Sequence, residues 1–392
     1  MKLEEFQIHI SNPCEVVTTG QQLNGMVIIN LTKPMKMKGV NIHVEGKAKT
    51  FWEIYGGKNT TKYRAYETYL NQVVSLVQAG KETGDQLKHP AGNHMYPFSL
   101  NIPANAPSSF EGRRGYVRYI CKATIERPWK LDQHVRRAFT VIHDLDLNLL
   151  SSYGVPIVLS KEENIQNWCC TAGTLGVTLS LQKTGFVPGE PILYDITVDN
   201  KSDNNINKVQ LELRQVVQYT GFCNHIFSSG SPKYHMKEEK FSLLNESLRV
   251  PKNETGRINR GSILPSLPPS YLEGCGIIST SYFVLLAVRC GRSLVKMEKE
   301  ILVGTIPFFR QPQSPRYLLS PPSLESTLPP PYDAAPPSYE ECVFGRTVIC
   351  EEGETNTVGE NDWAPAYPNY NWQIQNVEIS TAVLQPPAYT EN

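Results

Sequence analysis

Three short segments late in the sequence share the form Pro-Pro-x-Tyr. They are Pro329-Pro330-Pro331-Tyr332, Pro336-Pro337-Ser338-Tyr339 and Pro386-Pro387-Ala388-Tyr389. Adjacent prolines favour a polyproline II helix, so such a segment can enter an aromatic-lined groove with little loss of backbone entropy. The tyrosine ring can then fill a second pocket, where its hydroxyl can form a hydrogen bond. This is the ligand pattern of WW domains, and it predicts peptide binding.

Acidic residues follow each motif and could meet basic residues on the rim of a WW domain. They are Asp333, Glu340, Glu341 and Glu391. One motif in a proline-rich stretch can arise by chance, and the alternative interpretation is a bland spacer. Three motifs on one segment favour the binding interpretation, because several weak sites raise occupancy through effective concentration.

Two further segments resemble the motif in a different setting. Pro268-Pro269-Ser270-Tyr271 matches it fully but lies between strand-like stretches, where a folded loop could not lay its backbone into another domain's groove. We therefore expect a structural role and exclude it from the sites. Ala364-Pro365-Ala366-Tyr367 lacks the first proline and is a degenerate candidate.

Length and composition limit the class of protein. The 392 residues exceed what one hydrophobic core usually serves, so two domains or two domains and a tail are expected. Net charge is +0 and no block of Lys or Arg occurs, which argues against nucleic acid as a partner.

Because no run of about eighteen apolar residues is present, we expect no transmembrane segment and a soluble intracellular protein. Nine cysteines without a CxxC pair suggest free thiols.

The part of the chain that precedes these motifs is predicted to consist of β-strands. Short alternating segments recur between turn residues, as in Phe6-Gln7-Ile8-His9-Ile10 and Val40-Asn41-Ile42-His43-Val44. A second series begins near Thr174 and repeats the same pattern. No segment keeps a helical period for long. We predict an all-β fold of two tandem sandwiches followed by a disordered tail.

The predicted boundaries follow changes in composition. Residues 1–150 form the first sandwich, 151–168 an inter-domain connector and 169–307 the second sandwich. Residues 308–392 are rich in Pro, Ser, Gln, Glu and Tyr and have few aliphatic clusters. Such a segment buries too little apolar surface to offset its ordering entropy, so we expect a disordered tail.

Other constellations give weaker signals. The basic residues Arg113, Arg114, Arg118 and Lys122 could form a patch facing an acidic partner or anionic lipid, with a solvated basic face as the alternative. No catalytic signature and no spaced set of metal ligands is present, so we predict no enzymatic activity, no metal and no cofactor.

Several stretches resemble the α-arrestins, or arrestin domain-containing proteins. The similarity covers nearly the whole part predicted to fold. The matching stretches include Phe98-Ser99-Leu100-Asn101-Ile102-Pro103, Pro107-Ser108-Ser109-Phe110-Glu111-Gly112, Gly115-Tyr116-Val117-Arg118-Tyr119 and Gly185-Phe186-Val187-Pro188-Gly189-Glu190. The resemblance implies two arrestin-type, immunoglobulin-like β-sandwiches without enzymatic activity.

The resemblance also implies a role. Proteins of this family link membrane receptors or transporters to Nedd4-type HECT E3 ubiquitin ligases, promoting cargo ubiquitination, endocytosis and endosomal sorting. The expected location is the cytoplasm, with recruitment to the plasma membrane and endosomes and peripheral membrane association. The three motifs exceed the two usual in many vertebrate members. The alternatives are a thioredoxin-linked redox regulator, a lipid- or cargo-binding scaffold that acts without a ligase, and an enzyme.

Overall fold

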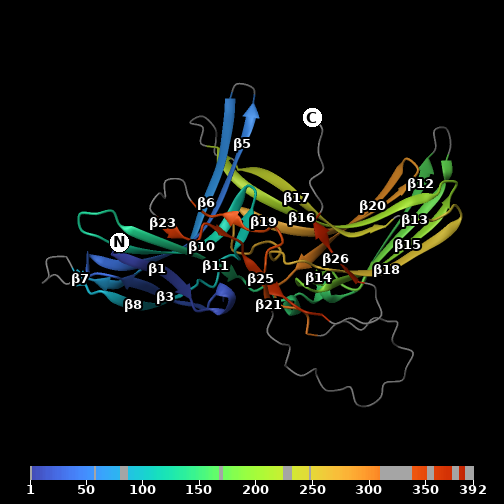
Figure 1. Cartoon of the computed structure of the whole chain (residues 1–392). Helices are drawn as coiled ribbons and strands as arrows, with labels where there is room; N and C mark the ends of the chain where they lie inside the picture. The colour runs from blue at the N-terminus through green and yellow to red at the C-terminus, as the bar shows by residue number, and fades with distance from the viewer. Residues whose placement is uncertain are drawn as a thin grey trace, which may run out of the picture.

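The computed structural model describes residues 2–56, 59–79, 87–166, 171–223, 232–246, 249–309, 338–350, 357–372 and 379–384. Within these ranges the chain consists of β-strands and short 3-10 turns, without an α-helix. Two β-sandwiches lie side by side, with the N-terminal strands in the first (Figure 1). The predicted all-β class and the tandem arrangement are confirmed.

The first sandwich packs a sheet of order β1-β3-β8 against strands β6-β5-β10-β11-β2. Its strands are β1 (Leu3–Ile10), β2 (Val16–Thr18), β3 (Gln22–Leu31), β4 (Met35–Met37), β5 (Gly39–Gly56), β6 (Asn59–Gln78), β7 (Leu87–His89), β8 (Gly92–Asn101), β9 (Phe110–Gly112), β10 (Gly115–Glu126) and β11 (Gln133–Ile142). In β5 the side chains of Val40, Ile42 and Val44 are fully buried, while the residues between them face outward. The period of two in the sequence therefore marks the core face.

The second sandwich faces strands β12-β13-β15-β18 toward β14-β20-β19-β16, with β17 beside β16. Its strands are β12 (Ile157–Gln166), β13 (Thr171–Leu181), β14 (Gly185–Phe186), β15 (Pro191–Ser202), β16 (Ile206–Cys223), β17 (Lys233–Glu246), β18 (Glu254–Ile263), β19 (Ile278–Cys290) and β20 (Ser293–Val303). A separate core fills this sandwich.

The predicted connector 151–168 is mostly a strand. Residues 157–166 form β12, which pairs antiparallel with β13 at the edge of the second sandwich. Its sequence is polar because most of its side chains are exposed or half-buried, and Ile165 alone in this strand is buried. The connector therefore shortens to the residues around the 3-10 turn Ser151–Gly154.

One sheet runs through both sandwiches. Strand β16 pairs with β6 through Phe222 opposite Arg64 and Cys223 opposite Tyr63. In the same strand, Tyr219 is buried in the core of the first sandwich. The Thr50 hydroxyl donates to the carbonyl of Thr220 at 2.6 Å. The second sandwich thus contributes both backbone and core to the first.

Parts of the segment predicted to be disordered are folded onto the sandwiches, which corrects that prediction for residues 338–350, 357–372 and 379–384. We call these three stretches the docked tail. Its strands are β21 (Ser338–Glu341), β22 (Thr347–Val348), β23 (Thr357–Gly359), β24 (Asp362–Trp363), β25 (Ala366–Asn369), β26 (Ile379–Thr381) and β27 (Val383–Leu384). A few large apolar side chains make the docking possible: Ile349, Trp363 and Tyr367 are at most 5% exposed.

Candidate functional site: the docked tail

The tyrosine of the second Pro-Pro-x-Tyr motif lies in a strand of the docked tail. In β21, Ser338 pairs with Asn369 and Tyr339 with Pro368 of the antiparallel strand β25. The Ser338 hydroxyl donates to the Asn369 carbonyl at 3.0 Å, and just beyond β21 the Cys342 amide donates to the Pro365 carbonyl at 2.8 Å. The motif's tyrosine therefore has an ordered backbone in the folded protein.

The Tyr339 side chain is half-buried against an apolar cluster. This cluster consists of Val16 and Ile142 from the first sandwich and Cys342 and Tyr367 from the docked tail. Removal from water raises the pKa of the Tyr339 phenol. The ring is thus a packing element as well as a motif residue.

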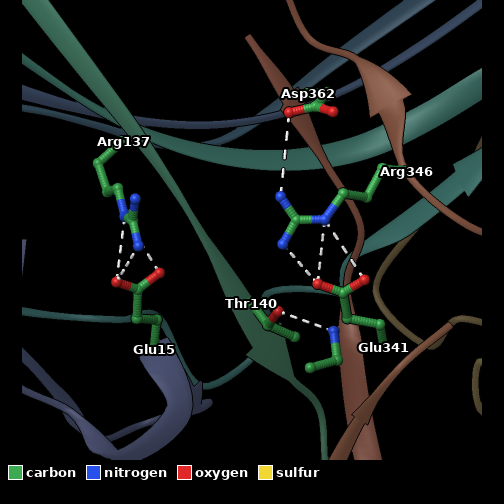
Figure 2. A network of polar contacts seen from close by, with 7 residues as sticks. Glu15, Arg137, Thr140, Glu341, Arg346 and Asp362 are labelled. Carbon is green, nitrogen blue, oxygen red and sulfur yellow. Dashed lines mark hydrogen bonds and ion pairs between the residues drawn. The ribbon is translucent and has the colours of Figure 1, made fainter. Parts of the chain in front are cut away.

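Tyr367 anchors the hairpin to the first sandwich. Its ring is 1% exposed, and its hydroxyl donates to the Ser109 carbonyl at 2.9 Å. Next to it, the Ala366 amide donates to the Thr140 hydroxyl at 3.0 Å, a contact visible beside the labelled Thr140 in Figure 2. Because Tyr367 is the tyrosine of the degenerate Ala-Pro-Ala-Tyr segment, that segment is a buried anchor.

The second sandwich holds the same hairpin from the other side. The Ser266 hydroxyl donates to the Glu340 carbonyl at 2.9 Å, and the Val343 amide donates to the Ser266 carbonyl at 3.1 Å. Beyond β25, the Tyr370 hydroxyl donates to the Thr305 carbonyl at 2.8 Å. The docked tail therefore bridges the two sandwiches, and Figure 1 shows β21 and β25 at their junction.

The tail also covers the outer face of β10 and β11. Ile349 and Trp363 pack against Ala138, with Ile120 at the margin of this cluster. Strand β23 adds to the edge of β11 in parallel, with Val358 opposite Val135. Backbone pairing at a sheet edge is sequence-tolerant, so the apolar residues must fix the register.

Ion pairs join the strands of the tail to one another. Arg346 contacts Glu341 at 2.6 Å and Asp362 at 3.9 Å, while nearby Arg137 of β11 contacts Glu15 at 2.5 Å (Figure 2). Arg346 and its two partners are about half exposed. Exposed pairs of this kind contribute about 0–1 kcal/mol each, so the apolar anchors dominate the docking.

The four predicted patch residues do not form one free basic surface. Arg118 is 8% exposed and pairs with Glu111. Burial raises the pKa of the Glu111 carboxyl, and the guanidinium of Arg118 opposes this rise. The Thr347 hydroxyl of the tail donates to the same carboxylate at 3.0 Å. Arg118 and Lys122 lie four residues apart in β10 and so share one face of the strand, but Lys122 is half-buried. Arg113 and Arg114 are exposed, and Arg113 lies 3.6 Å from Glu239.

The remaining motif residues are placed as follows. Tyr271 has a left-handed backbone with φ of 69°, and the carbonyls of Pro268 and Pro269 accept hydrogen bonds from Tyr282 and Thr280. Its predicted structural role is confirmed. The first and third motifs, with Pro329, Pro330, Tyr332, Pro386, Pro387 and Tyr389, and the prolines Pro336 and Pro337 of the second, lie outside the described residues.

The residues that dock the tail were not predicted from the sequence. Their signal is a local density of aromatic side chains at Trp363, Tyr367, Tyr370 and Trp372, inside a segment whose average composition is polar. Composition averaged over the whole segment hid this density. Spacing gave no indication either, because the strands of the tail have two to four residues each.

The cysteines in the described part of the chain differ in their exposure to solvent. Burial raises the pKa of the Cys121, Cys275 and Cys342 thiols, the last to about 12, which opposes thiolate formation. Cys14 and Cys350 are exposed. Within the described ranges, no group of three or more His, Cys, Asp or Glu residues could hold a metal ion. No helix there is long and apolar enough to cross a membrane.

Comparison with known proteins places both sandwiches in one family. Residues 6–148 match the model of the arrestin (or S-antigen) N-terminal domain, and residues 171–308 match that of the C-terminal domain. Arrestin domain-containing protein 17 of Caenorhabditis elegans is 30% identical over 94% of this chain and 99% of its own length. Arrestin domain-containing protein 1 of Homo sapiens is 25% identical over 86% of this chain and 72% of its own length.

Proposed function

Because this chain belongs to the α-arrestin family of arrestin domain-containing proteins, we propose that it is an adaptor that brings a Nedd4-type HECT ubiquitin ligase to membrane receptors or transporters. The observation that carries the proposal is the set of three Pro-Pro-x-Tyr motifs that follow the second arrestin domain. Each motif has the proline pair and the tyrosine that a WW domain recognises. The ubiquitin transfer itself belongs to the ligase.

The mechanism is proximity. The sandwiches hold cargo while the motifs hold the ligase, so ubiquitin transfer occurs at a raised local concentration of cargo lysines. Three motifs in one chain can engage the tandem WW domains of a single ligase, and avidity offsets the weakness of each contact. Ubiquitination of the adaptor itself is an expected by-product.

The proposed place of action is the cytoplasmic side of the plasma membrane and of endosomes. There the adaptor would promote endocytosis and sorting of the ubiquitinated cargo. Peripheral association through the sandwiches suffices for this role. The exposed side chains of Arg113 and Arg114 are the remaining candidates for contact with acidic groups at that surface.

Ubiquitin transfer to membrane proteins tests the proposal. Membrane vesicles would be incubated with E1, E2, a Nedd4-type ligase and either the wild-type chain or a variant with Tyr332, Tyr339 and Tyr389 changed to Ala. With the wild type we expect the ligase to ubiquitinate a subset of membrane proteins, and with the triple variant we expect no ubiquitination above the background without adaptor. Tyr271→Phe is the matched control and should behave as wild type, because that motif is locked in the fold.

Two results would contradict the proposal. Equal ubiquitination with the wild type and the triple variant would show that the motifs do not recruit the ligase. Membrane recruitment that is lost on charge reversal of Arg113 and Arg114, with ubiquitination independent of the three tyrosines, would favour a scaffold that acts without a ligase.

A further inference from the structure

We propose that the folded body of this protein masks its second Pro-Pro-x-Tyr motif, so that the sandwiches and a WW domain compete for Tyr339. The inference rests on the proposed function, because it concerns the regulation of one of the three ligase-binding motifs. It divides the motifs into a conditional one, ending at Tyr339, and two others ending at Tyr332 and Tyr389.

The geometry excludes simultaneous occupancy. A WW domain takes the tyrosine ring into its own pocket and contacts the extended backbone of the motif. In the docked tail, the same ring packs against the apolar cluster formed by Val16, Ile142, Cys342 and Tyr367. Backbone pairing of Ser338 and Tyr339 with β25 occupies the chain beside it. A WW domain can therefore bind this motif only after Tyr339 leaves the cluster.

The backbone that follows Tyr339 is also engaged by the second sandwich. The carbonyl of Glu340 accepts a hydrogen bond from the Ser266 hydroxyl at 2.9 Å. The carboxylate of Glu341 pairs with Arg346 at 2.6 Å, a contact within the tail itself. Docking thus removes the tyrosine ring and a stretch of backbone from the recognition surface at once.

Competition requires that docking be neither too strong nor too weak. The buried anchors Ile349, Trp363 and Tyr367 favour docking because their side chains leave water. The loss of backbone freedom in the tail opposes it. A WW domain can shift this equilibrium because it binds Tyr339 only in the released state.

Two contacts on the sandwiches allow the docking to be weakened without altering the motif or the tail. The Thr140 hydroxyl accepts from the Ala366 amide at 3.0 Å, and the Ser266 hydroxyl donates to the Glu340 carbonyl at 2.9 Å. Thr140→Val and Ser266→Ala nearly preserve side-chain shape. Each removes one hydrogen bond between the body and the tail.

The test isolates the second motif in the full chain. In the Tyr332→Ala/Tyr389→Ala chain, Tyr339 provides the only intact motif of the three, and its affinity for one Nedd4-type WW domain is measured by calorimetry. A free peptide of residues 330–346 carrying Tyr332→Ala, which keeps Arg346 beside Glu341, gives the unmasked reference. We expect the full chain to bind at least about tenfold more weakly than the peptide. Adding Thr140→Val and Ser266→Ala should recover roughly tenfold, the size expected from two ordinary hydrogen bonds.

A matched chain keeps the first motif instead, through Tyr339→Ala and Tyr389→Ala. Its affinity for the WW domain should not change with the Thr140→Val/Ser266→Ala pair, and circular dichroism checks separately that the pair leaves the protein folded. If the peptide and the full chain bind equally and the pair has no effect, masking is wrong while ligase recruitment stands. If the free peptide itself does not bind, the second motif is not a WW ligand and both proposals fail for it.

Discussion

Three tyrosines with similar local sequences have different surroundings in this protein. Tyr271 is fixed by its left-handed backbone and by the bonds that hold its loop, Tyr367 is fully buried, and Tyr339 is half-buried in a short strand. A motif describes what a segment could bind, whereas accessibility depends on what the ring already contacts. At the scale of single residues, Tyr339 combines a complete motif with partial burial.

At this scale, a buried ion pair within the first sandwich also contacts the tail, because the Thr347 hydroxyl donates to the Glu111 carboxylate that pairs with Arg118. Arg118→Ala would leave the carboxylate of Glu111 in a buried site without its cationic partner. We expect a loss of about 3–5 kcal/mol in unfolding free energy, the usual result of breaking a buried pair. Arg113→Ala is the control, since its pair with Glu239 is exposed on the arginine side and should contribute under about 1 kcal/mol. Urea denaturation measures both, and equal effects would contradict this account.

At the scale of elements, the tail uses exposed sheet edges. Strand β23 extends β11, β26 extends β18 in parallel, and β27 pairs with β17. Unpaired edges invite pairing with other chains. The docked tail therefore satisfies backbone groups within the molecule, and its removal would leave three strands available for association.

Two glycines of the tail test the β23 contact. Gly359 has φ of 106°, and a Cβ there would lie 2.4 Å from the Arg136 carbonyl oxygen. Gly345 has φ of 78° but open space around a Cβ. Both Ala substitutions carry backbone strain, so the steric clash is the difference between them. We expect Gly359→Ala to speed amide exchange at residues 357–359 by at least about tenfold and Gly345→Ala to leave it unchanged. Equal exchange in both variants would contradict the contact.

Cys342 provides a chemical probe of β21. Its thiol is 5% exposed and burial raises its pKa to about 12, so alkylation at pH 8 should be slow while the tail is docked. Release returns the pKa toward its ordinary value and increases the thiolate fraction. A saturating WW domain should therefore accelerate iodoacetamide labelling of Cys342, measured by peptide mass spectrometry.

Two controls accompany this probe. Labelling of Cys121, which is buried in the core of the first sandwich, should not respond to the WW domain. In a Tyr339→Ala chain, adding the WW domain should produce no acceleration at Cys342. A labelling rate at Cys342 that is the same with and without the WW domain would count against release.

At the scale of the whole molecule, two of the contacts that join the sandwiches differ in kind. A shared sheet runs through β6 and β16, and the docked tail contacts the first sandwich at Ser109 and the second at Thr305. The sheet junction includes core residues such as Tyr219, whereas the tail joint depends on a segment that also carries a partner motif.

Strands with a long alternation of apolar and polar residues were predicted from the sequence, whereas strands without it were not. Strands such as β5 and β15 alternate over many residues, and the sequence therefore predicted the sandwiches. The polar edge strand β12 lacked that signal because few of its residues are buried. The docked tail was missed because its strands are short and its partners, such as Ser109 and Thr140, are distant in sequence. The binding chemistry of the motifs could be predicted from the sequence. The accessibility of their tyrosines could be determined only from the fold.

The measurement that tests the central claim most directly is binding of the tandem WW domains of a Nedd4-type ligase to the full chain. The wild type would be compared with the variant carrying Tyr332→Ala, Tyr339→Ala and Tyr389→Ala, with Tyr271→Phe as the control. The account predicts binding by the wild type and the control, and loss of binding by the triple variant. Retained binding by the triple variant, or no binding by the wild type, would contradict it.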